Sequence, residues 1–407
     1  MSRKIHLKAN PSLRAHVEHL PASKSISNRV LILDALSGGK SQLHNLSDAN
    51  DTRLMRELVG SESPLIDVED AGTTMRFLTA YFAITGKSKT LTGTSRMLER
   101  PIGILVDALR TLGATINYKN VEGYPPLDIQ GFSGQKAERV SIRGDVSSQF
   151  ISAVMMIAPL LPNGLTIKLT GKVGSRPYIE MTAALMDSFG VRCSFGENLI
   201  RIDHQKYHAC EMSVESDWSG ASYWFAFAAL ARETDIRLPH LFESSLQGDH
   251  VVRGLMESLG VRSAMEDGML RLTKKHSTDN FSWDFSNSPD LAQTIAVVCA
   301  AKGIRGHFTG LESLRIKETD RIAALQRELR KIGANLEEHD KGWSVIPSAL
   351  LPEHAEFETY GDHRMAMAFA PLATMMDVSI IDPIVVKKSY PKFWLDVEVA
   401  GFDVAQT

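Results

Sequence analysis

Residues 147–158 of this 407-residue chain read SSQFISAVMMIA. The three polar residues Ser147-Ser148-Gln149 directly precede a mostly apolar run, residues 150–158, that is long enough to form a helix. A helix that is apolar on nearly all sides belongs in the interior of a protein. The N–H groups at a helix start lack partners within the helix, and the start carries about half a positive charge. A buried helix that begins in this way is therefore suited to binding an anion.

The same arrangement occurs six times along the chain. The openings are Ser23-Lys24-Ser25, Gly72-Thr73-Thr74, Ser147-Ser148-Gln149, Asp217-Trp218-Ser219, Pro289-Asp290 and Asp362-His363-Arg364. Thr73, Ser147, Asp217, Asp290 and Asp362 follow one another at intervals of 74, 70, 73 and 72 residues. A regular period of this size indicates a repeated supersecondary structure.

Between the buried helices the sequence predicts amphipathic helices that end at a glycine. They are Leu105–Leu112, Ala184–Phe189, Leu255–Leu259 and Leu325–Ile332, each followed directly by Gly. Glycine suits the left-handed conformation that closes many helices. The alternating stretches 114–118 and 191–195 then predict strands. Six such repeats, three per domain, predict two similar α+β domains.

The first repeat is shorter than the others. Ser25 and Thr73 are only 48 residues apart. This repeat retains a predicted helix at Arg53–Val59, but no alternating stretch follows the helix. We therefore expect the first repeat to lack strands.

Composition and charge exclude several classes of protein. The chain is 43% hydrophobic and 23% charged, and its net charge of −3 does not suggest nucleic-acid binding. No apolar run reaches the roughly 18 residues of a membrane span, and the N-terminal residues lack the apolar core of a signal peptide. Cys193, Cys210 and Cys299 match no metal or disulfide spacing. No glycine-rich loop for ATP or a dinucleotide occurs. We expect a cytoplasmic protein without metal, cofactor, membrane or nucleic-acid partner.

The densest group of charges lies at residues 314–321, which read LRIKETDR. One interpretation is a solvated helix start with acidic caps and local ion pairs. The other places Lys317 and Arg321 on one helical face, where they would bind an anion and set the proton affinity of Glu318. The sequence leaves both interpretations open.

Lys24 and Arg29 flank a Ser-Ile-Ser-Asn segment at the first opening. They could be solvated residues that follow a serine N-cap. The apolar segment Val30–Leu33 leaves Arg29 little solvent, however, and a buried cation without a partner is costly. A phosphate or carboxylate ligand would remove that cost.

Asp290 also has two interpretations. It could be an ordinary helix N-cap, or a general base whose carboxylate faces a substrate hydroxyl. Asp217 has the same form, and we interpret it as a cap.

Six motifs, in order along nearly the whole chain, resemble those of the EPSP synthase (3-phosphoshikimate 1-carboxyvinyltransferase) family. They are Lys24–Arg29, Asp70–Arg76, Arg100–Ile102, Ser147–Phe150, Lys317–Arg321 and Asp362–Met367. The resemblance implies a two-domain α+β fold of six βαβαββ repeats, like an inverse α/β barrel, with the first repeat shortened. It implies one domain of residues 1–20 and 216–407, a second of residues 21–215, and an active site in the cleft between them.

The resemblance also implies a reaction and a set of site residues. The enolpyruvyl group of phosphoenolpyruvate passes to the 5-hydroxyl of shikimate 3-phosphate, with Asp290 as proton acceptor and Glu318 as proton donor, in a monomer without cofactor or metal. The residues implied for shikimate 3-phosphate are Lys24, Ser25, Arg29, Ser147, Ser148, Gln149, Ser175, Asp290, Ser313 and Lys317. Those implied for phosphoenolpyruvate are Lys24, Gly72, Arg100, Gln149, Arg321, Arg364 and Lys388.

Two residues depart from the family's pattern. Phe77 stands where proline is common, so we expect the helix to sit differently around Gly72. Ser313 stands where asparagine is common, and its shorter side chain would reach the substrate through water.

Two other functions remain open. A related enolpyruvyl transferase acts on UDP-N-acetylglucosamine and generally uses a reactive cysteine in a mobile loop. A non-catalytic relative would bind anions but would not need both Asp290 and Glu318.

Overall fold

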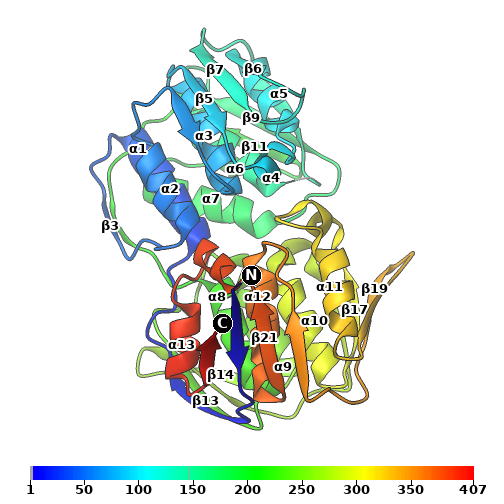
Figure 1. Ribbon diagram of the computed structural model, residues 1–407. Coiled ribbons are helices and arrows are strands. Elements are labelled where there is room, and N and C mark those ends of the chain that lie inside the picture. The colour runs from blue at the N-terminus through cyan, green and yellow to red at the C-terminus, as the bar shows by residue number, and fades with distance from the viewer. Residues whose placement is uncertain (1–2, 146) are drawn as a thin grey trace. The chain divides into compact units, whose positions relative to one another are not determined.

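The computed structural model describes residues 3–145 and 147–407. The chain divides into two compact units (Figure 1). Unit 1 combines the N-terminal segment up to Ala22 with Glu215–Thr407, and unit 2 is Ser23–Val214. The chain therefore leaves unit 1 after Ala22 and returns to it at Glu215.

Unit 2 contains seven helices of the α type among its described residues. They are α1 (Lys24–Ser37), α2 (Asn50–Leu58), α3 (Gly72–Ile84), α4 (Ser95–Leu98), α5 (Gly103–Leu112), α6 (Ser148–Ile157) and α7 (Arg176–Ser188). The strands are β3 (Gln42–His44), β4 (Leu65–Asp67), β5 (Lys89–Thr92), β6 (Ala114–Tyr118), β7 (Leu127–Phe132), β8 (Arg139–Arg143), β9 (Leu165–Thr170), β10 (Ser194–Phe195), β11 (Leu199–Ile202) and β12 (Glu211–Ser213). A 3₁₀ turn, η1 (Ala158–Leu160), extends α6.

Unit 1 has the same kinds of element. Its α-helices are α8 (Trp218–Leu230), α9 (Val252–Ser258), α10 (Ala292–Ala301), α11 (Arg321–Arg330), α12 (His363–Phe369) and α13 (Phe393–Val399). Its strands are β1 (Lys4–Leu7), β2 (Ser12–His16), β13 (Glu233–Leu238), β14 (Val261–Glu266), β15 (Met269–Lys274), β16 (Asn280–Asp284), β17 (Arg305–Thr309), β18 (Asn335–His339), β19 (Gly342–Ile346), β20 (His354–Phe357), β21 (Asp377–Ile381) and β22 (Val404–Gln406). Its 3₁₀ turns are η2 (Gly248–Val251), η3 (Phe285–Asn287), η4 (Pro289–Leu291), η5 (Glu312–Ile316), η6 (Ala370–Thr374) and η7 (Pro383–Lys388).

The sheets repeat one pattern. In the sheet β4-β5-β7-β6, β4 and β5 are parallel and joined through α3, and the other two pairs are antiparallel. A parallel pair needs a crossover connection, whereas antiparallel neighbours can be joined by a short turn. The βαβαββ repeat follows directly from this pattern. Four further four-stranded sheets in the described part of the chain also have one parallel and two antiparallel pairs.

The expectation that the first repeat lacks strands is wrong. Strand β3 lies between α1 and α2, and it pairs in parallel with β12 to form a two-stranded sheet in unit 2. Strand β12 precedes α8 in sequence, and the corresponding place beside β13 in unit 1 is taken by β2. Strand β2 precedes α1 in sequence but pairs with β13, and β12 precedes α8 but pairs with β3. The two repeats have therefore exchanged their first strands. The N-terminal strand β1 completes the sheet of the last repeat, where it pairs antiparallel with β21 and with β22.

All six predicted helix starts are confirmed. Helices α1, α3, α6, α8 and α12 begin at the polar openings, and Pro289–Leu291 forms a 3₁₀ turn that runs into α10. Every residue of α10 and of α12 is buried. In unit 1, α10 packs against both α8 and α12. Their apolar faces form the centre of that unit's core. No helix within residues 3–145 and 147–407 meets the length and hydropathy of a membrane-crossing segment.

The amphipathic helices are confirmed, and their glycines act as predicted. Gly113 closes α5 with a φ of 117°, a conformation that glycine tolerates best. A Cβ atom there would also lie 2.1 Å from the carbonyl oxygen of Gly134. Strand β6 matches the prediction, but in 191–195 only Ser194–Phe195 forms a strand. The preceding residues connect α7 to β10, and Val191 is buried there.

Truncating a side chain in the three-helix core should destabilise unit 1 strongly. Ile295 of α10 is fully buried, so Ile295→Ala should lower the free energy of unfolding by about 2–5 kcal/mol. The matched truncation Leu350→Ala, at a side chain that is 86% exposed, should change it by less than about 0.5 kcal/mol. All five tryptophans lie at positions 218–394, so tryptophan fluorescence during urea unfolding reports on unit 1. Equal effects of the two truncations would contradict the assigned core.

Candidate active site

The guanidinium group of Arg321 contacts three carboxylates of unit 1. Arg321 begins α11, and its side chain is only 2% exposed. It donates to Asp362 at 2.7 Å, to Glu318 at 2.9 Å and to Asp290 at 3.0 Å. Three carboxylates from three chain segments thus meet on one cation, and both proposed acid–base residues are among them.

Two more cations contact the same carboxylates. Nη2 of Arg364 lies 2.8 Å from Oδ2 of Asp290, and Nζ of Lys388 lies 3.6 Å from Oε1 of Glu318. Arg364 also donates to the hydroxyl of Tyr223 at 3.2 Å. Lys388 is buried, whereas the neighbouring Lys387 is exposed, which agrees with Lys388 as the predicted ligand.

The N-cap interpretation of Asp290 is wrong. Asp290 lies inside η4, whose N-cap is Ser288, and neither η4 nor α10 receives a side-chain cap. The Asp290 carboxylate is held by cations instead. Desolvation raises its pKa, but the charges of Arg364, Lys317 and Arg321 outweigh this effect and hold the pKa well below its usual value. The Asp290 carboxylate is therefore ionised. Its proton affinity depends on how strongly these cations interact with it.

Lys317 and Arg321 do not share a helical face, so that prediction is wrong. Lys317 is extended, with φ −85° and ψ −153°, and α11 begins only at Arg321. Asp320 caps α11 by accepting from the amide of Ala323 at 3.0 Å, as the first interpretation of this stretch expected. Because Asp320 satisfies the helix start, Lys317 and Glu318 are left outside the helix in the connection from η5.

Ser313 is the second residue of η5, and it is partly exposed. Asp217, by contrast, is confirmed as the cap of α8. It accepts from the amides of Ser219 at 2.7 Å and Gly220 at 3.2 Å.

The most buried cation of unit 2 is Arg29, which is 2% exposed. Its guanidinium donates to neutral oxygens: Thr182 Oγ1 at 2.7 Å, the Ser25 carbonyl at 2.9 Å and Ser152 Oγ at 3.1 Å. Burial lowers its pKa to about 10. The oxygens that accept these hydrogen bonds carry no formal charge. The anion ligand that the sequence suggests for Arg29 stays a prediction.

Phe77 contributes to this arrangement. Its ring centroid lies 5.3 Å from Cζ of Arg29, and the ring of Tyr178 lies 5.9 Å from the same atom. Aromatic rings attract cations through their quadrupoles. The departure from proline therefore places a ring against the buried arginine, and Phe77 continues α3 as a regular helical residue.

Around Gly72, two more arginines approach the start of α3. Arg76 donates to the carbonyl of Gly72 at 2.8 Å. A Cβ atom on Gly72 would lie 2.6 Å from a nitrogen of Arg76 and 2.7 Å from one of Arg100. Only a residue without a side chain allows both guanidinium groups to come so close to this helix start.

The remaining predicted residues of unit 2 also lie at helix starts. Lys24 begins α1 and pairs with Asp51 at 3.2 Å, a partner that the sequence analysis missed. Gln149 donates to the hydroxyl of Thr73 at 3.0 Å, which links the starts of α6 and α3. Ser147 caps α6, Ser148 begins it, and Ser175 precedes α7 with a φ of 53°.

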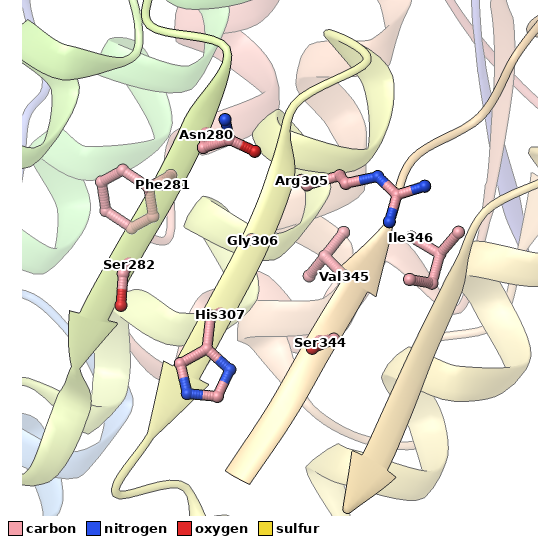
Figure 2. Close-up of a pocket in the computed structure, with 9 residues that line it drawn as sticks. All are labelled: Asn280, Phe281, Ser282, Arg305, Gly306, His307, Ser344, Val345 and Ile346. Carbon is pink, nitrogen blue, oxygen red and sulfur yellow. The ribbon is translucent and has the colours of Figure 1, made fainter. Parts of the chain in front are cut away.

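A surface hollow elsewhere in unit 1 contains none of these residues. Figure 2 shows it over β16, β17 and β19, with a volume of about 330 Å³. Its lining residues are Asn280, Phe281, Ser282, Arg305, Gly306, His307, Ser344, Val345 and Ile346. The predicted acid–base chemistry is therefore not located in this hollow. Within the described residues, no group of three or more His, Cys, Asp or Glu side chains could hold a metal ion.

Comparison with known proteins identifies the family. The family model described as EPSP synthase (3-phosphoshikimate 1-carboxyvinyltransferase) matches residues 7–61 and 60–397. The chain belongs to the EPSP synthase family. The sequence-based identification of the family is thereby confirmed.

Individual relatives agree with this assignment. A 3-phosphoshikimate 1-carboxyvinyltransferase of Bacteroides fragilis (strain YCH46) is 47% identical over 406 residues, which cover 98% of each chain. The protein of the same name from Neisseria meningitidis serogroup B is 38% identical over 407 residues, covering 92% of this chain and 93% of that one. A solved EPSP synthase from Acinetobacter baumannii superposes with a TM-score of 0.79 at 19% identity and covers 100% of both chains. The predicted α+β fold is confirmed.

Removing the central arginine should destabilise unit 1 because three carboxylates would lose their shared counter-charge. We expect Arg321→Leu to lower the free energy of unfolding by about 3–5 kcal/mol. Arg271→Leu is the matched control, because Arg271 also pairs with two carboxylates, Asp235 and Glu266, but is 33% exposed. Its loss should cost less than about 1 kcal/mol. Tryptophan fluorescence in urea measures both variants, and equal costs would contradict the assigned role of burial.

Proposed function

We propose that this chain catalyses the transfer of the enolpyruvyl group of phosphoenolpyruvate to the 5-hydroxyl of shikimate 3-phosphate. The products are 5-enolpyruvylshikimate 3-phosphate and inorganic phosphate. Membership of the EPSP synthase family across nearly the whole chain is the observation that carries this proposal. The pairing of Asp290 and Glu318 on Arg321 supports it, because the reaction needs one group to accept a proton and another to donate one.

We assign the phosphoenolpyruvate anions to Lys24, Gly72, Arg100, Gln149, Arg321, Arg364 and Lys388. Arg364 contacts Asp290, and Lys388 contacts Glu318. An incoming carboxylate competes with these side chains for the same cations. Substrate binding would then loosen the hold of Arg364 on Asp290 and raise the proton affinity of that carboxylate.

We assign shikimate 3-phosphate to Lys24, Ser25, Arg29, Ser147, Ser148, Gln149, Ser175, Asp290, Ser313 and Lys317. The helix starts of unit 2 supply N–H groups and hydroxyls, which suit a phosphate. Arg29 supplies a buried charge whose present partners are neutral oxygens.

The two carboxyl groups have separate roles. Asp290 accepts the proton of the 5-hydroxyl as that oxygen attacks C2 of phosphoenolpyruvate. Glu318 donates a proton to the methylene carbon, C3, which becomes a methyl group. The Glu318 carboxylate then takes a proton back from this methyl group as the C2–O bond to phosphate breaks, which releases phosphate and leaves the enolpyruvyl ether. The surrounding cations stabilise the negative charges in a site from which water is excluded.

We also propose that the enzyme works as a cytoplasmic monomer without cofactor, metal, membrane or nucleic-acid partner. Its net charge of −3 would not favour nucleic acid.

Replacing either carboxyl group by its amide should reduce turnover without unfolding the protein. A positioned general acid or base contributes about 10²- to 10⁴-fold in rate, so Asp290→Asn and Glu318→Gln should each reduce kcat by about that factor. The assay is phosphate release with both substrates present. The controls Asp235→Asn and Glu266→Gln, in surface pairs with Arg271, should keep kcat within about twofold. Turnover like that of the unaltered enzyme in either amide variant would overturn its assigned role.

Thiol alkylation separates this function from that of the related transferase with a reactive cysteine. Burial raises the pKa of all three thiols, that of Cys193 to about 12, which favours their protonated form at neutral pH. Iodoacetamide at pH 7 should therefore leave phosphate release with shikimate 3-phosphate unchanged. Rapid inactivation, together with activity on UDP-N-acetylglucosamine, would favour the other enzyme.

A further inference from the structure

A further carboxyl group, that of Asp249, is connected to Arg364 through the hydroxyl of Ser219. Asp249 is in η2 and is 2% exposed. Its Oδ2 accepts a very short hydrogen bond from the hydroxyl of Ser219, in the first turn of α8. Its other oxygen, Oδ1, is buried and has no hydrogen-bond partner among the described residues. A buried carboxylate with one unsatisfied oxygen is costly while it is charged.

The Ser219 hydroxyl connects this carboxyl group to the proposed substrate ligands. Nη2 of Arg364 lies 3.5 Å from Ser219 Oγ, and the same nitrogen lies 2.8 Å from Oδ2 of Asp290. Ser219 can thus accept from Arg364 while it donates to Asp249. The guanidinium of Arg364 thus contacts Asp290 directly, and it contacts Asp249 through the Ser219 hydroxyl.

We propose that Asp249 is a positioning residue for Arg364, and that it takes up a proton when the carboxylate of phosphoenolpyruvate binds this arginine. The inference rests on the proposed function and adds to it a residue that does not touch substrate. While Asp249 is ionised, it adds a negative charge behind Arg364 and competes with the substrate for that cation. Once protonated, it leaves Arg364 free to pair with the incoming anion.

The surroundings of Asp249 agree with this role. Burial, followed by the nearby charge of Asp290, raises the pKa of Asp249 to about 7, although Arg364 and the Ser219 hydrogen bond act against the shift. Asp217 at the start of α8 also raises it. The neighbouring charged groups on η2 and α9 are His250 and Arg253, and burial followed by Arg253 lowers the pKa of His250. Asp249 is therefore balanced between its two forms near neutral pH.

The first test is the KM for phosphoenolpyruvate, measured by phosphate release at saturating shikimate 3-phosphate between pH 6 and pH 8. Asp249→Asn mimics the protonated group at every pH. The ratio of the KM of the unaltered enzyme to that of the variant cancels the titration of the substrate itself. With the Asp249 pKa at about 7, this ratio should be close to one at pH 6 and rise to about tenfold at pH 8. A ratio that does not change with pH would overturn the proposal.

Glu215→Gln is the matched control. Glu215 is another buried carboxyl group of unit 1 with a raised pKa, but it accepts from the Ser245 hydroxyl at 2.5 Å and from the Phe242 amide. Its variant should retain the pH dependence of the unaltered enzyme. If Asp249→Asn does not fold, Ser219→Ala provides the second test, because it keeps the carboxyl group and removes the link to Arg364. It should lower the KM for phosphoenolpyruvate at pH 8, because the ionised carboxylate would no longer compete for Arg364 through the hydroxyl, and an unchanged KM would count against the link.

An infrared pH titration tests the protonation step without turnover. The carbonyl stretch of a protonated carboxyl group should titrate near pH 7, grow when phosphoenolpyruvate is added at pH 7.5, and be absent from Asp249→Asn. Its persistence in that variant would overturn the proposal. If the unaltered enzyme releases no phosphate, the proposed function fails, while the titrating band still reports on Asp249 separately.

Discussion

The charged centre of unit 1 depends on the contact between the Arg321 guanidinium and three carboxylates. Asp290, Glu318 and Asp362 belong to η4, the connection before α11 and the cap of α12. Each of these carboxylates would be costly in a partly or fully buried position without a counter-charge. Arg321 thus fixes the relative positions of three chain segments as well as the charge of the site. The buried helices α10 and α12 supply the rigid support, because their apolar sides allow little freedom.

The two units balance charge differently. In unit 1, Arg321, Arg364 and Lys388 contact carboxylates. In unit 2, the hydrogen bonds of Arg29 go to hydroxyl and carbonyl oxygens, and burial lowers its pKa. Under the proposed function, the first arrangement would link anion binding to the basicity of Asp290 and Glu318. The second would offer a buried cation to the phosphate of the substrate.

Much of this architecture follows from local sequence rules. A polar residue before an apolar run predicted every buried helix start, since capping and burial involve residues close together in the chain. Asp217 and Asp320 are caps for the same local reason. The family resemblance also pointed to two of the residues that contact Arg321, namely Asp290 and Glu318.

Features that depend on distant pairing could not be predicted. Strand β3 is only three residues long, and it exists because β12, about 170 residues later, supplies its hydrogen-bond partners. The α-helical spacing of Lys317 and Arg321 was misleading because Asp320 caps α11 after Lys317. Asp51 and Asp249 gave no local signal, since a carboxylate on an ordinary turn or helix acquires its role only from the cation or hydroxyl that folding brings to it.

Phosphate release with each substrate alone and with both together tests the central claim most directly. If the proposed reaction is correct, phosphate should appear only when shikimate 3-phosphate and phosphoenolpyruvate are both present. It should appear in a one-to-one ratio with the enolpyruvyl product. Release from phosphoenolpyruvate alone, or no release with both substrates, would contradict the account.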